Sequence, residues 1–540
     1  MITSWPSKRA FCTLRYWALT YASFLCNQNQ SEQSSMALFN LGLGLDAGTA
    51  LLLLAVVFVI YYLVSSAIAW HPLRAFPGPL VGKFSYFWLI SNARSGRPAE
   101  HFTKLNRRHG ALVRIGPNDL VTDDPDVIRR MNGARSTYSR SSWYQSTKLN
   151  PHEDSMFSLR DVGAHDRLKA KCAAGYAGRE NTELEAGVDS QVANAISLIR
   201  RKYITTGDAV RPMDLGKVVQ FFTLDAITRV AYGKEFGYLA TDSDVYDYIG
   251  TTEAVVPYLQ LCGEVPYIQR IVFSKFVLGM VGPKHTDESG LGKLMGVAKK
   301  VVAKRFGSDA KEERDMLGAF VRHGVSQAEC ETEVLFQIIA GSDTTATAIR
   351  TTLLYTMTSP HTYHTLKKEI NTAIDEGRIS SPVTHEEGKK LPYLQAVIYE
   401  GLRMNAPFTG LCAKEVPPEG DTIDGRFIPG GTRVAQNVWG ALRRADVFGR
   451  DADLFRPERW TEADAAGRDR MQKTTELAFG HGRWGCAGKN VAFLELNKIY
   501  VELLRNFDFQ IMDPAKPWHS VNFNLFMQDN FWVKVTEARR

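Results

Sequence analysis

The chain has 540 residues, of which 44% are hydrophobic and 11% aromatic, so it is long enough to bury a sizeable core. The formal net charge of +7 is modest for this length, and scattered basic residues argue against nucleic acid as a partner. A basic face for an acidic protein or for anionic lipid stays open. The seven cysteines include no Cys-x-x-Cys pair, which argues against a disulfide framework or a structural zinc site and indicates a reducing compartment.

Residues 1–46 are treated as an N-terminal extension, predicted to be lumenal. Asn29-Gln30-Ser31 within it is a formal glycosylation sequon. Translation starts either at Met1 or at Met36, whose "MALFNLGLGLDAGTA" leads directly into the next segment, and we prefer Met36 slightly. N-terminal sequencing of the native protein would decide between the two.

Residues 47–70, "AGTALLLLAVVFVIYYLVSSAIAW", contain no charged side chain. A helix needs roughly 20 apolar residues to cross the hydrocarbon core of a membrane, so this stretch predicts a single transmembrane anchor rather than a buried core helix. Arg74 and Lys83 follow it closely, whereas Asp46 precedes it. The positive-inside tendency therefore places the C-terminal part in the cytoplasm.

After the anchor, residues 71–80 hold three prolines in "HPLRAFPGP" and predict a stiff, non-helical hinge. Residues 81–540 are expected to form one catalytic domain without repeats or linkers. Most of it carries the apolar spacing of helices, and strand signals stand near both ends. The expected helices include 185–202, 215–232 and 291–306, and the expected strand regions are 110–124, 420–437 and 521–537.

A further helix is predicted to begin at the capping box Ser326-Gln327-Ala328-Glu329 and to end before Pro360. Its centre, "AGSDTT" at 340–345, contains a glycine, an acid and two β-branched hydroxyl residues, which are poor formers of a helix interior. Such a local violation in a long apolar helix predicts a functional kink. A polar, solvent-facing stretch is the alternative.

"LAFGHGRWGCAGKN", residues 477–490, presents one cysteine among four glycines. Apolar spacing from Val491 onward predicts a helix that begins just after Cys486, and the N-terminus of a helix stabilises a thiolate. The glycines remove side chains where the backbone bends tightly or approaches something flat. A thiolate in such a loop suits an axial ligand of haem iron, although a single cysteine is more often a buried structural residue.

At these residues the chain resembles the cytochromes P450, the haem-thiolate monooxygenases. The cysteine signature is matched by Phe479, Gly482, Cys486 and Gly488, and the oxygen-activation signature by Ala340, Gly341, Asp343, Thr344 and Thr345. Glu-x-x-Arg is matched by Glu400 and Arg403, and "FRPERW" adds Arg459 as the third member of a structural ion-pair network. The resemblance implies a mainly α fold with small β-sheets, the cytochrome P450 fold, preceded here by a single N-terminal transmembrane helix.

The chain departs from the family pattern near the cysteine, because Trp484 occupies the position where many members have an arginine that meets a haem propionate. Arg483 stands one position earlier, and the resemblance assigns Gly480 and Phe479 to the haem loop. His165 and Lys169 in "AHDRLKA" match the early helix that contacts the propionates. "GRW" and "MFSLRDVGAH" are similar to a fungal branch that includes pisatin demethylase.

The resemblance implies a monooxygenase with heme b, which inserts one oxygen atom from O2 into a lipophilic small molecule by hydroxylation or oxidative demethylation. Cys486 would bind the iron, and Asp343 and Thr344 would deliver protons. NADPH–cytochrome P450 reductase would supply electrons, with Arg483 and Lys489 on its docking face. The expected setting is the endoplasmic reticulum membrane, a monomer, and fungal secondary metabolism.

The resemblance also implies an apolar substrate pocket lined by the helix through Ala340, by residues 406–411 and by residues 524–527, with the loop 136–147 as a roof. Two rival functions stay open. A haem-thiolate isomerase or dehydratase would act on a peroxide without a reductase, and a membrane-anchored scaffold would keep the fold without catalysis. The substrate and the position oxidised are not encoded in any motif.

Overall fold

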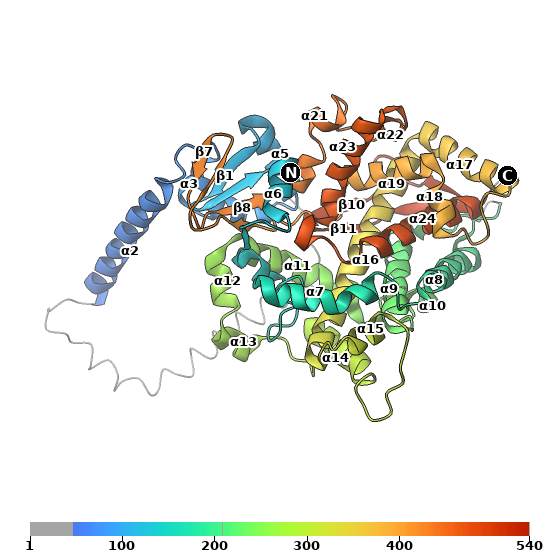
Figure 1. Cartoon of the computed structure of the whole chain (residues 1–540), viewed down its shortest axis with the longest axis horizontal. Coiled ribbons are helices and arrows are strands. Elements are labelled where there is room, and N and C mark those ends of the chain that lie inside the picture. The colour runs from blue at the N-terminus through green and yellow to red at the C-terminus, as the bar shows by residue number, and fades with distance from the viewer. Residues whose placement is uncertain (1–46, 208, 539–540) are drawn as a thin grey trace. The chain divides into compact units, whose positions relative to one another are not determined.

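The computed structural model describes residues 47–207 and 209–538, which fall into two units (Figure 1). The first unit ends at His71 and contains helix α2 (Ala47–Trp70), and the second begins at Pro72. The predictions for residues 1–46, including the sequon at Asn29 and the start at Met36, lie outside the described residues.

Helix α2 is apolar along its whole length. Within Gly48–Trp70 an 18-residue window reaches a mean hydropathy of 2.6, and among the described residues this is the one helix that length and composition qualify to cross a membrane. The side chains from Leu51 to Val64 are exposed. Burial in a protein core therefore does not account for their composition, and α2 is a candidate membrane span.

The second unit is mainly helical, with small sheets. The helices of its first half are α3 (Leu80–Phe84), α4 (Phe87–Ala93), α5 (Pro98–His109), α6 (Pro125–Asn132), α7 (Val162–Tyr176), α8 (Leu184–Leu198), α9 (Leu215–Tyr232), α10 (Tyr238–Thr241), α11 (Tyr248–Glu264), α12 (Pro266–Val272) and α13 (Lys275–Val281). Those of the second half are α14 (Gly290–Ala303), α15 (Met316–Arg322), α16 (Gln327–Thr358), α17 (Pro360–Asp375), α18 (His385–Lys389), α19 (Pro392–Met404), α20 (Val438–Ala441), α21 (Ala445–Phe448), α22 (Glu458–Glu462), α23 (Ala465–Thr475) and α24 (Lys489–Asn506).

The strands form a five-stranded sheet in the order β1-β2-β8-β5-β3, a three-stranded sheet in the order β4-β12-β9, and the two-stranded pairs β6-β7 and β10-β11. Their bounds are β1 (Leu112–Gly116), β2 (Asp119–Thr122), β3 (Ser139–Arg140), β4 (Met213–Asp214), β5 (Lys414–Glu415), β6 (Asp421–Ile423), β7 (Arg426–Ile428), β8 (Arg433–Gln436), β9 (Phe507–Ile511), β10 (His519–Phe523), β11 (Leu525–Asp529) and β12 (Trp532–Glu537).

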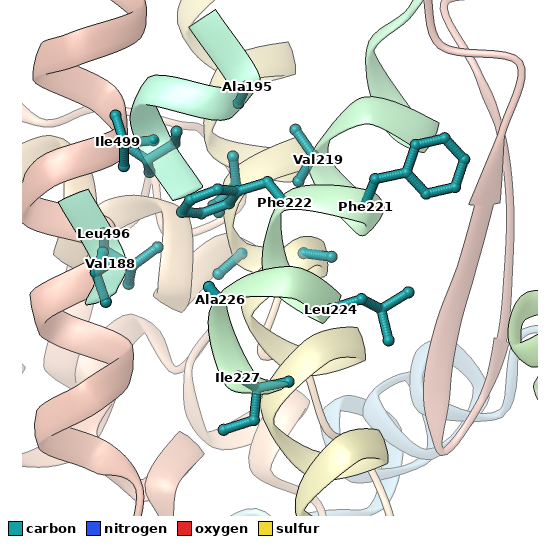
Figure 2. Close-up of a cluster of buried hydrophobic side chains, with 14 of the residues drawn as sticks. Val188, Ala195, Val219, Phe221, Phe222, Leu224, Ala226, Ile227, Leu496 and Ile499 are labelled. Atoms are coloured by element: carbon teal, nitrogen blue, oxygen red, sulfur yellow. The ribbon is translucent and has the colours of Figure 1, made fainter. Parts of the chain in front are cut away.

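The core lies around α9, in which every residue is buried except Lys217 and Arg229. Figure 2 shows Phe222 and Ala226 on the side of α9 that faces α8 and α24, whereas Phe221 and Leu224 point the other way. A helix that is apolar all round belongs in the centre of a large domain. Helix α16 packs closely on α9, since a Cβ at Gly341 would come within 2.7 Å of the Ile227 side chain.

The structure confirms most of the expected elements. The helix predicted at 215–232 is α9, and those predicted at 185–202 and 291–306 are α8, followed by a π-helical turn at Ile199–Tyr203, and α14. The three strand regions contain β1–β2, β6–β8 and β10–β12. The segment expected as a hinge is non-helical up to Pro79, and its Leu73 and Phe76 are buried in an apolar cluster of the second unit.

The long helix α16 begins at the predicted capping box, where Ser326 and Glu329 exchange side-chain-to-backbone hydrogen bonds. It runs as an α-helix without a break through residues 340–345. The hydroxyls of Ser342 and Thr344 donate to the carbonyls of Ile338 and Ala340, four residues back, at 2.6 and 2.7 Å. Such bonds often bend a helix without breaking it. The stretch is buried or half-buried rather than solvent-facing.

Candidate active site

The segment around Cys486 is a tight loop that leads into α24. The backbone N–H of Cys486 donates to the carbonyl of Phe479 at 2.7 Å and closes the loop. Gly480 and Gly482 have φ of +73° and +57°, and a Cβ at Gly482 would lie 2.5 Å from the Asn132 carbonyl oxygen. Only glycine adopts these angles without strain, so the two glycines fix how the loop presents its sulfur.

Cys486 lies three residues before the first residue of α24. Burial raises the pKa of its thiol, while the N–H groups of Gly488 and Lys489 and the charge of Lys169 act to lower that pKa. The side chain keeps exposed surface although protein surrounds it, as a group that lines an internal cavity would. The sulfur is therefore accessible to a ligand, and the helix N-terminus favours its thiolate form.

Helix α7 holds the cysteine loop from one side. The Lys169 ammonium donates to the carbonyls of Arg483 and Gly485 at 2.6 and 3.0 Å. The Arg483 guanidinium in turn pairs with Asp166 at 3.2 Å. Lys169 and Arg483, both predicted to contact the haem, thus lie beside the loop, where their printed contacts fix its backbone.

Two buried cations face the ring of Trp484 from the five-stranded sheet. Arg140 and Lys414 are direct partners in the antiparallel pair β3–β5, and their charged groups lie 3.9 and 4.1 Å from the centre of that ring. The imidazole of His165 lies 4.4 Å from the same ring, centre to centre. Burial and the neighbouring Arg140 lower the pKa of Lys414 to about 6, and burial lowers that of His165 to about 4.

This cation pair lacks a counter-charge among the described residues. The Lys414 side chain is fully buried and its Nζ has no hydrogen-bond partner there, and the Nε of Arg140 is likewise unpartnered. Like charges directly opposite each other destabilise a sheet, and a buried unpaired charge is costly. The arrangement is therefore suited to an anionic group. Sequence reasoning missed both residues, although each is a lone cation in an otherwise uncharged short stretch, "STYSRSSWYQST" and "GLCAK".

Asp343 of α16 is held by side chains from two other helices. The Gln220 amide of α9 donates to one carboxylate oxygen and the Tyr248 hydroxyl of α11 to the other, both at 2.8 Å. Burial raises the pKa of Asp343 to about 6, against the lowering effect of Tyr248 and of the Arg350 charge. Arg350 also donates to Gln220 at 2.7 Å. A carboxyl group with this pKa exchanges protons near neutral pH, as a proton-delivery group must.

The family model for cytochrome P450 matches residues 76–534. The chain belongs to the cytochrome P450 family. It is 52% identical to the cytochrome P450 monooxygenase ABA1 of Pyricularia oryzae over 88% of this chain and 95% of that protein. It is 46% identical to aba1 of Botryotinia fuckeliana over 86% and 92% of the two chains, and 30% identical to pisatin demethylase of Fusarium vanettenii over 83% and 85%. The recognised family and the likeness to the fungal branch are confirmed.

Membership of the P450 family implies a haem-thiolate iron cofactor and an oxidoreductase. The residues of this chain fit the cofactor. Cys486 offers a sulfur donor beside a helix N-terminus, and Arg140 offers a positive charge without a counter-charge. Lys414, whose pKa of about 6 leaves it mostly neutral at pH 7, would be held protonated by a propionate beside it. Trp484 stands where many family members have an arginine, and the two cations that stack on its ring are placed to take over that arginine's task.

Replacing Lys414 with methionine tests this assignment. If its ammonium holds a propionate, loss of that charge-assisted hydrogen bond should speed the transfer of haem from the protein to an apoprotein acceptor by about tenfold or more. The exposed Lys473, which pairs with Asp469 at 2.6 Å, gives the control Lys473→Met. A haem transfer rate equal to that of the control would contradict the role of Lys414.

Glu400 of this P450 sits at the centre of a buried polar network. Arg403 donates to its two oxygens at 2.7 and 2.8 Å, and Arg459 donates to one of them at 3.0 Å. Trp460 Nε1 and the backbone N–H of Arg456 complete the set at 2.9 and 2.8 Å. The side chains of Glu400 and Arg403 are fully buried. All three predicted members thus lie together, and their partners are structural.

A mainly apolar chamber lies beside α16. The stretches expected around the pocket all contribute to it: Phe336 and Ile339 from α16, Phe408, Asn524 and Leu525, and Thr147 from the loop expected as a roof. Sequence reasoning did not foresee the wall formed by α11.

Proposed function

We propose that this chain inserts one oxygen atom from O2 into a lipophilic small molecule, by hydroxylation or oxidative demethylation. The observation that carries the proposal is the half-buried Asp343, held by Gln220 and Tyr248 next to Thr344 on α16, in a chain whose cysteine loop fits a haem thiolate. The relatives named as monooxygenases support it as well. We assign the process to fungal secondary metabolism on the same likeness.

Cys486 would hold the iron of heme b through its sulfur, and the bound heme b would supply the oxygen-activating chemistry. The protein's own part is to hold the sulfur, to balance the propionates and to move protons. Gln220 and Tyr248 fix both oxygens of the Asp343 carboxylate. Its raised pKa lets it exchange a proton near neutral pH. The Thr344 hydroxyl donates to the Ala340 carbonyl, and its oxygen keeps lone pairs that can accept a hydrogen bond.

The proposed electron source is NADPH, delivered by NADPH–cytochrome P450 reductase to a monomer in the endoplasmic reticulum membrane. In this proposal residues 47–70 form a single-pass anchor, residues 71–80 connect it to the cytoplasmic catalytic domain at 81–540, and residues 1–46 are lumenal. Arg483 and Lys489 are proposed for the docking face of the reductase. Both are partly exposed, and they pair with Asp166 and Glu476.

Reconstitution with the reductase tests the proposal. The chain should oxidise NADPH and consume O2 only when the reductase is present, and it should form an oxygenated product. An isomerase or dehydratase that acts on a peroxide would turn over without NADPH, and a scaffold would not turn over at all. No finding on this chain favours either rival.

The variant Thr344→Ala tests the proton-delivery role of Thr344 in the same reconstituted assay. NADPH oxidation should continue, while product formed per NADPH should fall by one to two orders of magnitude as peroxide leaks, because a positioned proton donor contributes at least about that much. Thr344→Ser should restore coupling. Thr347→Val, three residues along α16 at a buried threonine, is the matched control. Unchanged product per NADPH in Thr344→Ala would refute the proton relay.

A further inference from the structure

Helix α11 forms one wall of the apolar chamber. The lining residues of α11 recur at helical spacing and are Thr251, Thr252, Val255, Val256, Leu259 and Gln260. Valine and leucine therefore occupy the middle of this wall, and polar side chains occupy its two ends. The whole set of residues that line the chamber contains no charged side chain.

Gln260 is a buried polar residue with an unused hydrogen-bonding atom. Its side chain has 0% exposure, and its Nε2 donates to Glu264 Oε1, one turn further on, at 2.7 Å. Its Oε1 has no partner among the described residues, and neither has the other carboxyl oxygen of Glu264. Exchanging the amide oxygen and nitrogen leaves the same number of atoms unsatisfied. A buried polar atom without a hydrogen-bond partner is destabilising. A bound molecule that supplies this partner would explain why Gln260 stands in the wall.

The Gln260–Glu264 pair is electrically neutral near neutral pH. Burial raises the pKa of Glu264 to about 8, although Gln260 and the charge of Arg433 act to lower it. Glu264 is therefore protonated at pH 7. With no charged side chain in the lining, an ionised ligand would enter an apolar chamber without a counter-charge, which is strongly unfavourable. The pair suits an uncharged oxygen.

Gln260 and the proton-delivery residues lie toward opposite ends of α11. Tyr248, the first residue of α11, donates to Asp343, and Gln260 follows twelve positions later. At 1.5 Å per residue the two side chains are separated by roughly 18 Å along the helix. A molecule held at Gln260 would extend along the valines and leucine of the wall toward the Asp343 end.

We infer that the chamber takes a lipophilic substrate with one uncharged oxygen group that hydrogen-bonds Gln260, so that the opposite, apolar end is directed toward Asp343 and Thr344. A hydroxyl would donate to the free Oε1, and a carbonyl would accept from Nε2 with the amide exchanged. The inference rests on the proposed function, because it names the substrate class of the same site. Gln260 acts as an anchor for one end of the substrate, and the part that is oxidised lies away from it.

The test compares 1-decanol with decane as probes of the full-length holoprotein. Binding is measured by calorimetry and by the shift in the ferric haem absorption, neither of which needs turnover. Gln260→Leu should lower the binding affinity for 1-decanol by about tenfold, the effect of one lost hydrogen bond. The same variant should bind decane as tightly as the wild type or more tightly. Gln260→Met gives a second variant in case the first folds poorly. Gln327→Leu is the control, because Gln327 donates to Glu331 at the same spacing of four residues but on the exposed surface of α16.

Equal effects of Gln260→Leu and Gln260→Met on the two probes would overturn the inference. Glu264→Gln should still bind 1-decanol more tightly than decane, because the new amide preserves an uncharged partner for Gln260. If this variant lost the preference for 1-decanol, a carboxylate would be required, and the inference would also be overturned. Decanoate at pH 7 should bind more weakly than 1-decanol, and tighter binding that depends on Gln260 would refute an uncharged oxygen. A failure of the proposed function would look different from a failure of this inference. In that case the protein would not oxidise NADPH in the presence of the reductase, while 1-decanol binding would still depend on Gln260.

Discussion

Cys486→Ala is expected to abolish the thiolate-specific carbon monoxide difference band of the reduced protein and all monooxygenase turnover. Alanine removes the sulfur that haem iron needs as a thiolate donor, and no other group replaces it in the loop. The hydrogen bond from the residue 486 N–H to Phe479 is a backbone bond and survives the change. The measurement is a reduced-plus-carbon-monoxide difference spectrum, together with product analysis in the presence of the reductase.

Cys262→Ala is the matched control for this variant. Cys262 is buried in α11, and burial raises the pKa of its thiol to about 11. It is therefore an uncharged, inert thiol at neutral pH. The control should keep the difference band. A Cys486→Ala protein that retains the band would mean that another residue binds the iron, and the site described above would be wrong.

The sequence predicted the parts of the fold that local patterns encode. The capping box at Ser326 marks the start of α16 because two adjacent residues satisfy each other's N–H groups. The continuous apolar pattern of 215–232 marks α9 because a central helix is buried on all sides. The residues at 340–345 are continuously helical although they are poor formers of a helix interior, and the hydroxyls of Ser342 and Thr344 bond the carbonyls four residues back. The kink expected there stays a prediction.

What the sequence did not predict are contacts between segments far apart along the chain. Arg140 and Lys414 meet only because β3 and β5 pair, and neither strand has more than two residues. Strands this short leave no alternation to detect. Tyr248 reaches Asp343 across 95 positions, and Gln220 reaches it across 123. The haem side of the site was predictable from the cysteine motif, whereas its anion-binding and carboxylate-holding partners required the fold.

The Glu400 network links α19 to the segment that leads to the cysteine loop. Glu400 accepts from Trp460 and from the Arg456 backbone, and Trp460 packs in one apolar cluster with Met471 and Leu477. Leu477 directly precedes the loop residues. Tyr399, next to Glu400, donates to Glu476 at 3.1 Å. Loss of the network should therefore destabilise the whole unit and loosen the loop that holds Cys486.

Glu400→Gln is expected to lower the free energy of unfolding by about 3–5 kcal/mol, because it leaves the buried Arg403 guanidinium without its anion. Arg459 would keep only its second carboxylate partner, Asp451. Urea unfolding of the holoprotein, followed by tryptophan fluorescence, measures the difference. A matched control comes from Glu386 and Lys389 on α18, which form an ion pair at the same spacing as Glu400 and Arg403, at 2.9 Å, but on the surface. Exposed pairs of this kind contribute little, so Glu386→Gln should leave the unfolding midpoint where it is.

The pH dependence gives this prediction a definite sign. The Arg403 and Arg459 charges and the hydrogen bonds they donate lower the pKa of Glu400 below its ordinary value of 4.5, in spite of the opposing effect of burial, which is the largest influence on it. The stability from the ionised carboxylate is therefore fully present above about pH 4.5 and is lost as the pH falls through the lower folded-state pKa. The difference between wild type and Glu400→Gln should be constant from pH 6 to 8 and should shrink only in acid. A difference that instead vanished as the pH rose toward 8 would mean that Glu400 is protonated in the folded protein, and the ion-pair account of the network would fail.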